Sequence, residues 1–368
     1  MSMISSELAL PCGARIKNRL CKAAMTEGIA DASNRATDRH VTLYQRWADG
    51  GAGVLLTGNV QVDRRYLERA GNIVIDGDQD AVQLRALEAM AEAGTAGDTQ
   101  LWMQISHAGR QTPKLIATEP VGPSDIPLAL PGGRFGKPRA LSGDEIRDVI
   151  KRFAFAAGIA KQTGFTGVQV HSAHGYLLSE FLSPRVNVRD DAWGGSVENR
   201  ARLLLDTVRA VRVAVGADFP VTVKLNSADF QKGGFSFDDC LHVIEMLNEE
   251  GLDLLEISGG NYEQPKLMGI GGLEPAFEEK VQQSTRAREA YFFDYAVAAS
   301  QVAKMPLMVT GGFRSAYGMN EALSGGDVDM VGVARPLCVD PVFPAKILSG
   351  ELEKAPDVEN NLRIGPGI

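Results

Sequence analysis

Eight short apolar runs, each followed by a segment with helical periodicity, constrain the fold of this chain more than any other feature. The runs are rich in Val, Ile and Leu and recur along nearly all of the 368 residues. Continuous apolar runs of this length are typical of strands buried on both faces of a parallel sheet, with helices as crossovers. The runs lie at residues 18–25, 53–60, 100–107, 167–171, 220–226, 252–258, 305–310 and 329–334.

The segments between the runs carry the periodicity and the start signals of amphipathic helices. Apolar residues recur every three to four positions in these segments, so that each helix would present one face to a sheet. Ser142 and Glu145 form a Ser-x-x-Glu capping box, which predicts a helix start at that point. The helices predicted with most support lie at residues 143–161, 197–215, 236–250 and 290–304.

Eight strand–helix pairs in one chain predict an α/β fold of the (β/α)8 TIM-barrel type, formed by a single domain over residues 1–368. An open doubly wound sheet has the same local pattern and is the alternative fold. No strand-to-helix junction carries Gly-x-Gly-x-x-Gly, which counts against a dinucleotide-binding open sheet. Two long aperiodic stretches, 113–141 and 261–288, are predicted to be active-site loops, because long loops in compact folds are usually functional.

Composition and charge exclude several classes of protein. The sequence has 38 Lys and Arg against 46 Asp and Glu, a net charge of −8, which argues against a nucleic-acid partner. No apolar run approaches the roughly 18 residues that cross a bilayer, and residues 1–10 lack the features of a secretory signal. The four cysteines show no Cys-x-x-Cys spacing, so we expect no sequence-local zinc or iron–sulfur site and a cytoplasmic location.

Polar side chains gather at the ends of the predicted strands. In a TIM barrel the catalytic groups lie just after the strands, at their carboxyl ends. Any one polar residue there could simply mark the point where a strand reaches the surface. The combination of imidazole, amide and cationic groups nevertheless predicts an active site at this rim. The residues concerned are Gln104, His107, His171, His174, Lys224 and Arg335.

His171 and His174 form the most informative pair. Two imidazoles three residues apart can line one pocket as hydrogen-bond donors or as metal ligands. A metal site would need further ligands, and His107 is a candidate, but no Asp or Glu at a strand end clearly supplies the rest. Each histidine taken alone could also bond a backbone carbonyl. We therefore expect no bound metal and keep a metal-dependent barrel enzyme as an alternative.

The last two strand ends have the composition of a phosphate-binding site. Gly311 and Gly312 follow the seventh run, and Ala334 and Arg335 follow the eighth. TIM barrels commonly bind phosphate after strands seven and eight, on backbone N–H groups and a short helix N-terminus. Glycine lets the backbone approach the anion closely, and arginine can bind it through two hydrogen bonds. We therefore expect a phosphate group at this position.

Several motifs spread over nearly the whole chain occur together. Phe-Leu-Ser-Pro stands at 181–184, and Asp-Asp-Ala-Trp-Gly-Gly-Ser-Val-Glu-Asn-Arg stands at 190–200. Lys-Asn-Arg at 17–19, His-Ala-Gly-Arg at 107–110 and His-x-x-His-Gly-Tyr at 171–176 complete the set. In this order the motifs resemble the Old Yellow Enzyme family, FMN-dependent ene-reductases with a TIM-barrel fold. The stretch from 181 to 200 is itself predicted to be structural, with Ser196 as a helix N-cap.

The resemblance implies that FMN binds at the strand ends. Thr26 matches a residue whose hydroxyl bonds the flavin near O4 and N5, in one turn with Ala24 and Met25. Gly58 and Gln104 match positions at the pyrimidine edge of the flavin ring. The other matched positions are Lys224, a cation beside N1 and O2, and Gly311, Gly312, Ala334 and Arg335 at the phosphate.

The resemblance also implies a catalytic set. His171 and His174 are similar to the pair that bonds the carbonyl oxygen of the substrate, where two donors stabilise the enolate-like charge formed as hydride arrives. Tyr176 matches the acid that protonates the α-carbon. The expected reductant is diffusible NADPH or NADH, because the chain lacks the clustered cysteines of larger, iron–sulfur-containing relatives. The expected substrate is a small molecule whose C=C bond is activated by a carbonyl or nitro group.

Some positions depart from the family pattern. Ala24 stands where many relatives have Pro, and Lys224 where many have Arg, which keeps the charge but loses the planar fork. A second active-site tyrosine after the first strand is replaced here by residues 27–29, Glu-Gly-Ile. Reduction of nitro groups or nitrate esters on the same flavin, and a non-catalytic barrel, are further alternatives. The family also leads us to expect a homodimer or larger assembly.

Overall fold

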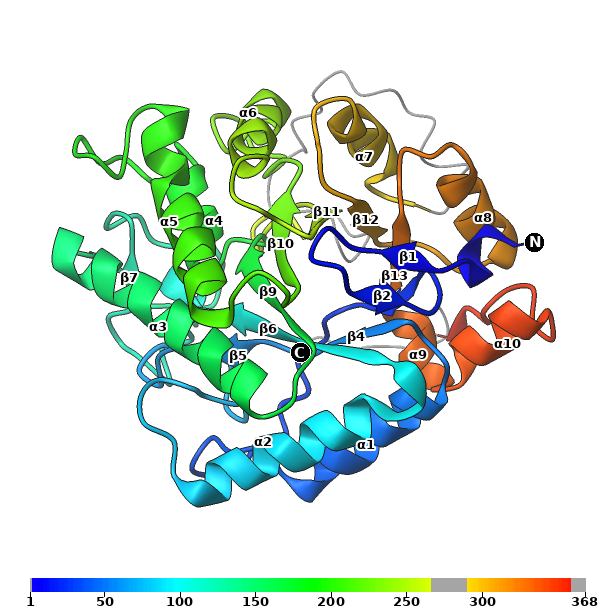
Figure 1. The fold of residues 1–368 in the computed structure, drawn as a ribbon. Helices are drawn as coiled ribbons and strands as arrows, with labels where there is room; N and C mark the ends of the chain where they lie inside the picture. Colours follow the sequence, from blue (N-terminus) through cyan, green and yellow to red (C-terminus); the bar gives the residue numbers. More distant parts are fainter. Residues whose placement is uncertain (1, 266–289, 359–368) are drawn as a thin grey trace.

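Within residues 2–265 and 290–358, which this computed structural model describes, eight parallel strands form a closed barrel (Figure 1). Each barrel strand overlaps one of the eight apolar runs, so the predicted strand positions are confirmed. The barrel strands are β3 (Leu20–Lys22), β4 (Val54–Leu56), β6 (Gln100–Ser106), β9 (Gly167–Ser172), β10 (Val221–Asn226), β11 (Leu254–Ser258), β12 (Leu307–Thr310) and β13 (Met330–Val333).

The hydrogen-bond ladder runs around the barrel without an edge. The strands follow one another in the order β4, β3, β13, β12, β11, β10, β9 and β6, and β4 also pairs with β6. The closing register aligns Leu55 with Leu101 and Leu56 with Trp102. This closure excludes the open doubly wound sheet and confirms the predicted (β/α)8 barrel. A further short strand, β5 (Val60–Gln61), pairs with the end of β6.

Helices surround the barrel on its outer side (Figure 1). The helices are α1 (Asp38–Asp49), α2 (Ala81–Gly94), α3 (Gly143–Gln162), α4 (Leu177–Leu182), α5 (Val197–Val215), α6 (Phe237–Leu247), α7 (Phe293–Ser300), α8 (Ala316–Ser324), α9 (Arg335–Val339) and α10 (Phe343–Ser349). Three 3-10 turns, η1 (Met3–Ser5), η2 (Ala96–Asp98) and η3 (Gly109–Gln111), complete the helical elements of the described residues.

The helix starts at α3 and α5 follow their predicted caps. The Ser142 hydroxyl accepts from the backbone N–H of Glu145, and the Glu145 carboxylate accepts from the N–H of Ser142, which is the predicted capping box. Ser196 caps α5 by accepting from the N–H of Asn199. Each cap satisfies a backbone donor that the first helical turn leaves unpaired.

Two helices are shorter than predicted. The helix predicted at residues 236–250 corresponds to α6, which ends earlier, at Leu247. The side chain of Asn248, the next residue, donates a hydrogen bond to the backbone oxygen of Val302. The helix predicted at residues 290–304 corresponds to α7, which starts later, at Phe293. Before it, the backbone N–H of Tyr291 donates to the carbonyl oxygen of Gly311 instead of joining the helix. Contacts to neighbouring segments thus displace residues that have helical periodicity.

Apolar side chains fill the barrel as well as the layer between strands and helices. An antiparallel hairpin of β1 (Leu8–Ala9) and β2 (Arg15–Ile16) packs against the barrel interior. Its side chains form one buried cluster with residues of β3, β4, β6, β11, β12 and β13. Strands of two residues carry no periodicity, so the sequence does not reveal this hairpin. Among the described residues, no helix is both long and apolar enough to span a membrane.

The first predicted loop contains secondary structure of its own. Within 113–141, β7 (Val121–Gly122) pairs in parallel with β8 (Arg139–Ala140), and Pro113 bridges to Phe135. The stretch therefore folds back on itself beside the barrel. Of the second predicted loop, 261–288, residues 261–265 are described and the rest lies outside the described residues.

Candidate active site

The neighbouring strands β9, β10 and β11 place three polar groups in register. His171, Lys224 and Glu256 occupy aligned positions on these neighbouring strands. Lys224 Nζ lies 3.0 Å from Glu256 Oε1, and both side chains are almost fully buried. Lys224 therefore reaches the predicted site as one half of a buried ion pair, and its charge is partly compensated.

The ion pair continues into a chain of amides across the barrel interior. Gln104 Nε2 donates to Gln169 Oε1 at 2.6 Å, and Gln169 Nε2 donates to Glu256 Oε2 at 2.8 Å. This series of side-chain hydrogen bonds thus connects β6, β9 and β11, and the ion pair between Lys224 and Glu256 adds β10. Because an amide has one acceptor oxygen and one donor nitrogen, these bonds determine which end of Gln104 faces Gln169.

His171 and His174 lie edge to face, with ring centroids 5.2 Å apart. The backbone N–H of Ala173 donates to His171 Nδ1 at 3.2 Å, so a neutral His171 ring carries its proton on Nε2. His174 Nε2 lies 2.7 Å from the hydroxyl of Ser258 at the end of β11. Each imidazole therefore has one nitrogen held by the protein and one nitrogen that these contacts do not use.

His174 is held in a backbone conformation that non-glycine residues rarely adopt. Its φ is 62°, in the left-handed region. Its N–H donates to Asn226 Oδ1 at 3.0 Å, and its carbonyl oxygen accepts from Gln111 Nε2 at 3.0 Å. Gly175, which follows, has φ 77°, and a Cβ there would lie 2.6 Å from Gln111 Oε1. The orientation of His174 is thus imposed by its surroundings.

Burial keeps the imidazoles neutral. It lowers the pKa of His171 well below 6.5, with the charges of His174 and Lys224 adding to the effect. It also lowers the pKa of His174 well below 6.5, with the charge of Lys224 adding to the effect. Burial also lowers the pKa of His107 to about 4. His107 Nδ1 accepts from the N–H of Gly109 at 3.1 Å. At neutral pH all three rings therefore act as neutral hydrogen-bonding groups.

Tyr176 lies directly beside His171, with ring centroids 4.9 Å apart. Its hydroxyl oxygen is 3.0 Å from the hydroxyl oxygen of Tyr262, in the segment that follows β11. Burial, followed by the charge of Glu68, raises the pKa of Tyr176 well above 10. The same two causes raise the pKa of Tyr262 to about 12. Both hydroxyls therefore keep their protons at neutral pH.

Thr26, just beyond β3, is tied to a carboxylate. Its hydroxyl donates to Glu68 Oε2 at 2.7 Å, and Asn59 Nδ2 donates to the same oxygen at 2.7 Å. One carboxylate oxygen thus connects the segments that follow β3 and β4. Because Thr26 has a single hydroxyl proton and uses it here, its oxygen can only accept a further hydrogen bond.

Gly58 packs tightly against the turn that follows β3. Its N–H donates to Glu27 Oε1 at 2.9 Å, and the same oxygen accepts from the hydroxyl of Tyr44 on α1. A Cβ at position 58 would lie 2.6 Å from the carbonyl oxygen of Met25 and 2.7 Å from Thr26 Cα. Glycine is therefore required at 58, and Glu27 links both strand ends to α1.

The turn after β3 also contacts the last strand–helix connection. Ala24 packs against the apolar cluster inside the barrel, and Met25 Sδ lies 3.4 Å from Cys338 Sγ on α9. Residues 24–26 therefore join the barrel interior, α9 and Glu68.

The ends of the neighbouring strands β12 and β13 carry the residues predicted to bind phosphate. Gly311 and Gly312 have φ values of 121° and 93°, which favour glycine. Ala334 precedes α9, and Arg335 is its first residue. Arg335 Nη2 donates to the hydroxyl of Tyr291 at 3.3 Å, and the N–H of Tyr291 donates to the carbonyl oxygen of Gly311 at 3.1 Å. Tyr291 thus connects the two strand ends.

Sequence reasoning missed several residues of this site. Gln169 and Glu256 are polar residues inside apolar runs, a signal that could have found them. Tyr262 lies in one of the two predicted loops, four residues beyond the end of β11. Glu68 has no local signal, because its contact with Thr26 depends on how β3 and β4 are placed side by side.

Among residues 2–265 and 290–358, no group of three or more His, Cys, Asp or Glu side chains could hold a metal ion.

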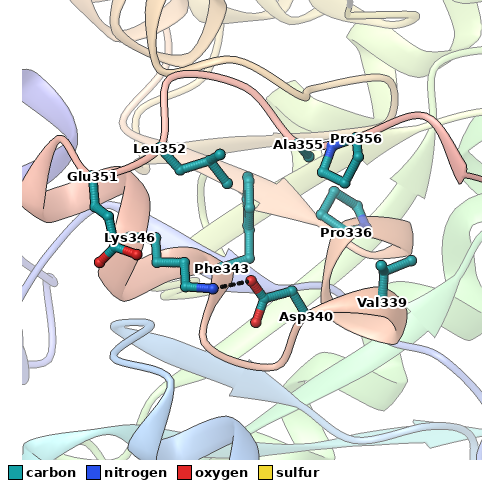
Figure 2. Close-up of a pocket in the computed structure, with 9 residues that line it drawn as sticks. All are labelled: Pro336, Val339, Asp340, Phe343, Lys346, Glu351, Leu352, Ala355 and Pro356. Carbon is teal, nitrogen blue, oxygen red and sulfur yellow. Dashed lines mark hydrogen bonds and ion pairs between the residues drawn. The ribbon is translucent and has the colours of Figure 1, made fainter.

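A cavity of about 390 Å³ lies between α9, α10 and the segment after α10 (Figure 2). Phe343 and Leu352 contribute to its wall, and Lys346 Nζ pairs with Asp340 at 2.8 Å beside it. None of the predicted site residues lines this cavity.

A sequence model of the NADH:flavin oxidoreductase / NADH oxidase family matches residues 12–354. The chain belongs to this family. The NADH-dependent flavin oxidoreductase iliE of Hypocrea jecorina is 39% identical over 360 residues, which cover 94% of this chain and 88% of that protein. The enzyme is therefore an FMN-dependent NAD(P)H oxidoreductase of the Old Yellow Enzyme type, as the motifs predict.

Solved structures show the same barrel. A 2-naphthoyl-CoA reductase complex is 26% identical with a TM-score of 0.83, over 95% of this chain and 52% of that one, so the oxidoreductase spans about half of it. The Old Yellow Enzyme homologue of Zymomonas mobilis is 23% identical with a TM-score of 0.79, over 99% of this chain and 97% of that one. At this level of identity the second likeness shows the fold alone.

The residues at the strand ends fit FMN by the chemistry of their donors. FMN has an anionic phosphate at one end and a polar pyrimidine edge at the other. The left-handed backbone at Gly311 and Gly312 and the guanidinium of Arg335 suit an anion. On β6 and β10, the Gln104 amide and the Lys224 ammonium group suit the polar edge. The side chains at these strand ends are thus chemically compatible with both ends of FMN.

Proposed function

We propose that this oxidoreductase reduces C=C bonds that are activated by a carbonyl or nitro group. The observation that carries the proposal is the juxtaposition of two neutral imidazoles with a protonated phenol. The ring of His171 lies 5.2 Å from that of His174 and 4.9 Å from that of Tyr176, centroid to centroid. Such a reduction needs hydrogen-bond donors for a developing oxyanion and an acid for the neighbouring carbon. These three side chains supply both.

The imidazoles would bind the oxygen of the activating group. His171 presents Nε2–H, because its Nδ1 accepts from the backbone of Ala173. His174 would present Nδ1, because Ser258 occupies its Nε2. Donors that are fixed before the reaction stabilise the charge without the cost of reorganisation. Lys224 favours the neutral form of both rings, so they donate without themselves being cations.

We infer that FMN lies across the strand ends. When bound, it supplies the hydride that it receives from NADH or NADPH. The turn at Ala24, Met25 and Thr26, together with Gly58, Gln104 and Lys224, would hold the ring, while Gly311, Gly312, Ala334 and Arg335 would hold the phosphate. Support comes from the family motifs and from the placement of these residues on neighbouring strands. Tyr176 would then protonate the α-carbon of the substrate.

The test follows the flavin absorbance of the purified enzyme without oxygen. NADH or NADPH should bleach the flavin, and 2-cyclohexenone should restore it with formation of cyclohexanone, detected by gas chromatography. Bleaching without recovery, across a panel of enones and nitroalkenes, would contradict the proposal. Recovery only with nitroaromatic compounds or nitrate esters would assign the enzyme to that alternative reaction.

A further inference from the structure

We propose that Tyr262 is a positioning residue for proton delivery: it orients the hydroxyl of Tyr176 and stabilises its oxygen after the proton has left. The inference rests on the proposed ene-reduction and adds a residue that the family motifs do not include. Its starting point is the 3.0 Å distance between the two hydroxyl oxygens. The second active-site tyrosine that follows the first strand in some family members is replaced here by residues 27–29. The fold instead places a tyrosine from the segment after β11 beside Tyr176.

The segment that carries Tyr262 is anchored on both sides of this residue. Arg110 Nη2 and Glu263 Oε2 form an ion pair at 3.0 Å, with both side chains at most 6% exposed. The second carboxylate oxygen of Glu263 accepts from the N–H of Ala129 at 2.8 Å. On the other side, Asn261 Nδ2 donates to Gln231 Oε1 at 2.7 Å. Tyr262 is therefore presented from a rigid support, as orientation of a partner hydroxyl requires.

The ring of Tyr262 is positioned as well. Its centroid lies 6.0 Å from that of Tyr176 and 6.2 Å from that of Phe135, in edge-to-face arrangements. Its backbone N–H donates to Gln111 Oε1 at 3.4 Å, and Gln111 also binds the carbonyl of His174. The same support thus holds Tyr262 and the substrate-binding histidine.

The hydrogen-bond capacity of the pair determines the direction of the bond. Each phenol has one proton, so Tyr176 can point its proton at the substrate only if its bond with Tyr262 is one that it accepts. In the reaction the O–H bond of Tyr176 breaks and a C–H bond forms at the α-carbon. The negative charge of the enolate passes to the Tyr176 oxygen, which then accepts a charge-assisted hydrogen bond from Tyr262.

Besides a side-chain hydrogen bond from Asn59, the surroundings offer little else to stabilise a charge on the Tyr176 oxygen. Tyr176 is only 5% exposed, and the charge of Glu68 opposes its ionisation, while His171 beside it is neutral. Tyr262 is partly exposed. Tyr262 can therefore pass its own proton to Tyr176 and regain one from water, which completes the balance of the step.

The experiment compares Tyr262→Phe with the wild-type enzyme in the two half-reactions. Phenylalanine keeps the ring contacts with Phe135 and Tyr176 and removes only the hydroxyl. Reoxidation of the reduced enzyme by 2-cyclohexenone should be roughly 10- to 100-fold slower, the value of a lost hydrogen bond to a charged group. Reduction by NADH, FMN content and reoxidation by oxygen, which needs no proton at carbon, should stay within about twofold. The control is Tyr317→Phe on α8, where the tyrosine is 75% exposed.

A double-mutant cycle separates positioning from a structural effect. In a Tyr176→Phe background, Tyr262→Phe should cause little further loss, because the hydroxyl on which it acts is gone. Wild-type reoxidation rates in Tyr262→Phe, or an equal loss in both backgrounds, would overturn the inference while leaving ene-reduction intact. If the wild-type enzyme reduces no activated alkene at all, the proposed function fails, and the role of Tyr262 fails with it.

Discussion

Replacing Lys22 with methionine should remove a pH-dependent decrease in the free energy of unfolding of this oxidoreductase. Lys22 is on β3 and is fully buried. Its Nζ donates to the carbonyl oxygen of Leu56 at 2.5 Å and lies 4.3 Å from the centroid of the Trp47 ring on α1. Methionine has a similar length and no charge, so it can fill the same space without the cost of burying an ammonium group.

The size of the penalty follows from the pKa. Burial, opposed by the charge of Glu27, lowers the pKa of Lys22 from 10.5 to about 8. At about 1.4 kcal/mol per pKa unit, this difference corresponds to about 3 kcal/mol. Below pH 8 both the folded and the unfolded states carry the charge, and the full penalty applies. Between pH 8 and 10.5 only the folded state has lost the proton, so stability rises with pH.

Urea unfolding at a series of pH values, with FMN in excess, measures this effect. The free energy of unfolding of the wild type, minus that of Lys22→Met, should rise by about 3 kcal/mol between pH 7 and 10.5. Taking the difference cancels the titrating groups that do not interact with Lys22. Lys304→Met, at a side chain that is 69% exposed, serves as the control and should show no such rise. A difference that does not change with pH would refute the reasoning.

Three further changes test the site and its support. His171→Ala combined with His174→Ala should abolish enone reduction but keep FMN binding and bleaching by NADH, measured by stopped-flow absorbance; enone turnover at the wild-type rate would exclude the oxyanion role. Gly58→Ala should cost about 1–3 kcal/mol in unfolding and lower FMN occupancy, since its Cβ would lie 2.6 Å from a carbonyl oxygen. Gly77→Ala, with no atom within 4 Å of the added carbon, is its control. Glu263→Ala leaves Arg110 buried without its carboxylate and should destabilise the protein by about 3 kcal/mol in urea unfolding; no loss would show that the ion pair is dispensable.

Local patterns in the sequence were sufficient for the barrel. A strand of three to seven residues buried on both faces is mostly apolar, so each barrel strand left a visible run. Helix caps depend on neighbouring residues along the chain, which is why Ser142 and Ser196 could be identified without a structure. Two-residue strands such as those of the β1–β2 hairpin leave no such pattern and stayed hidden.

The candidate site could be predicted only in part. Residues at the ends of strands, such as His171 and Lys224, were identifiable because the barrel rule and the family motifs both point to strand ends. Their partners were not. Glu256 was hidden within an apolar run, and its pairing with Lys224 depends on the register between β10 and β11. The family motifs likewise contain Tyr176 but not Tyr262.

The sequence by itself therefore determined the barrel, the family and the types of side chain at the rim, because these depend on residues close together in the chain. Only the tertiary structure decided which side chains meet: Thr26 with Glu68, and Tyr176 with Tyr262 across 86 positions. The physical reason is that a hydrogen bond requires two atoms within about 3 Å. That distance is set by strand register and loop path over the whole barrel, which no local pattern encodes.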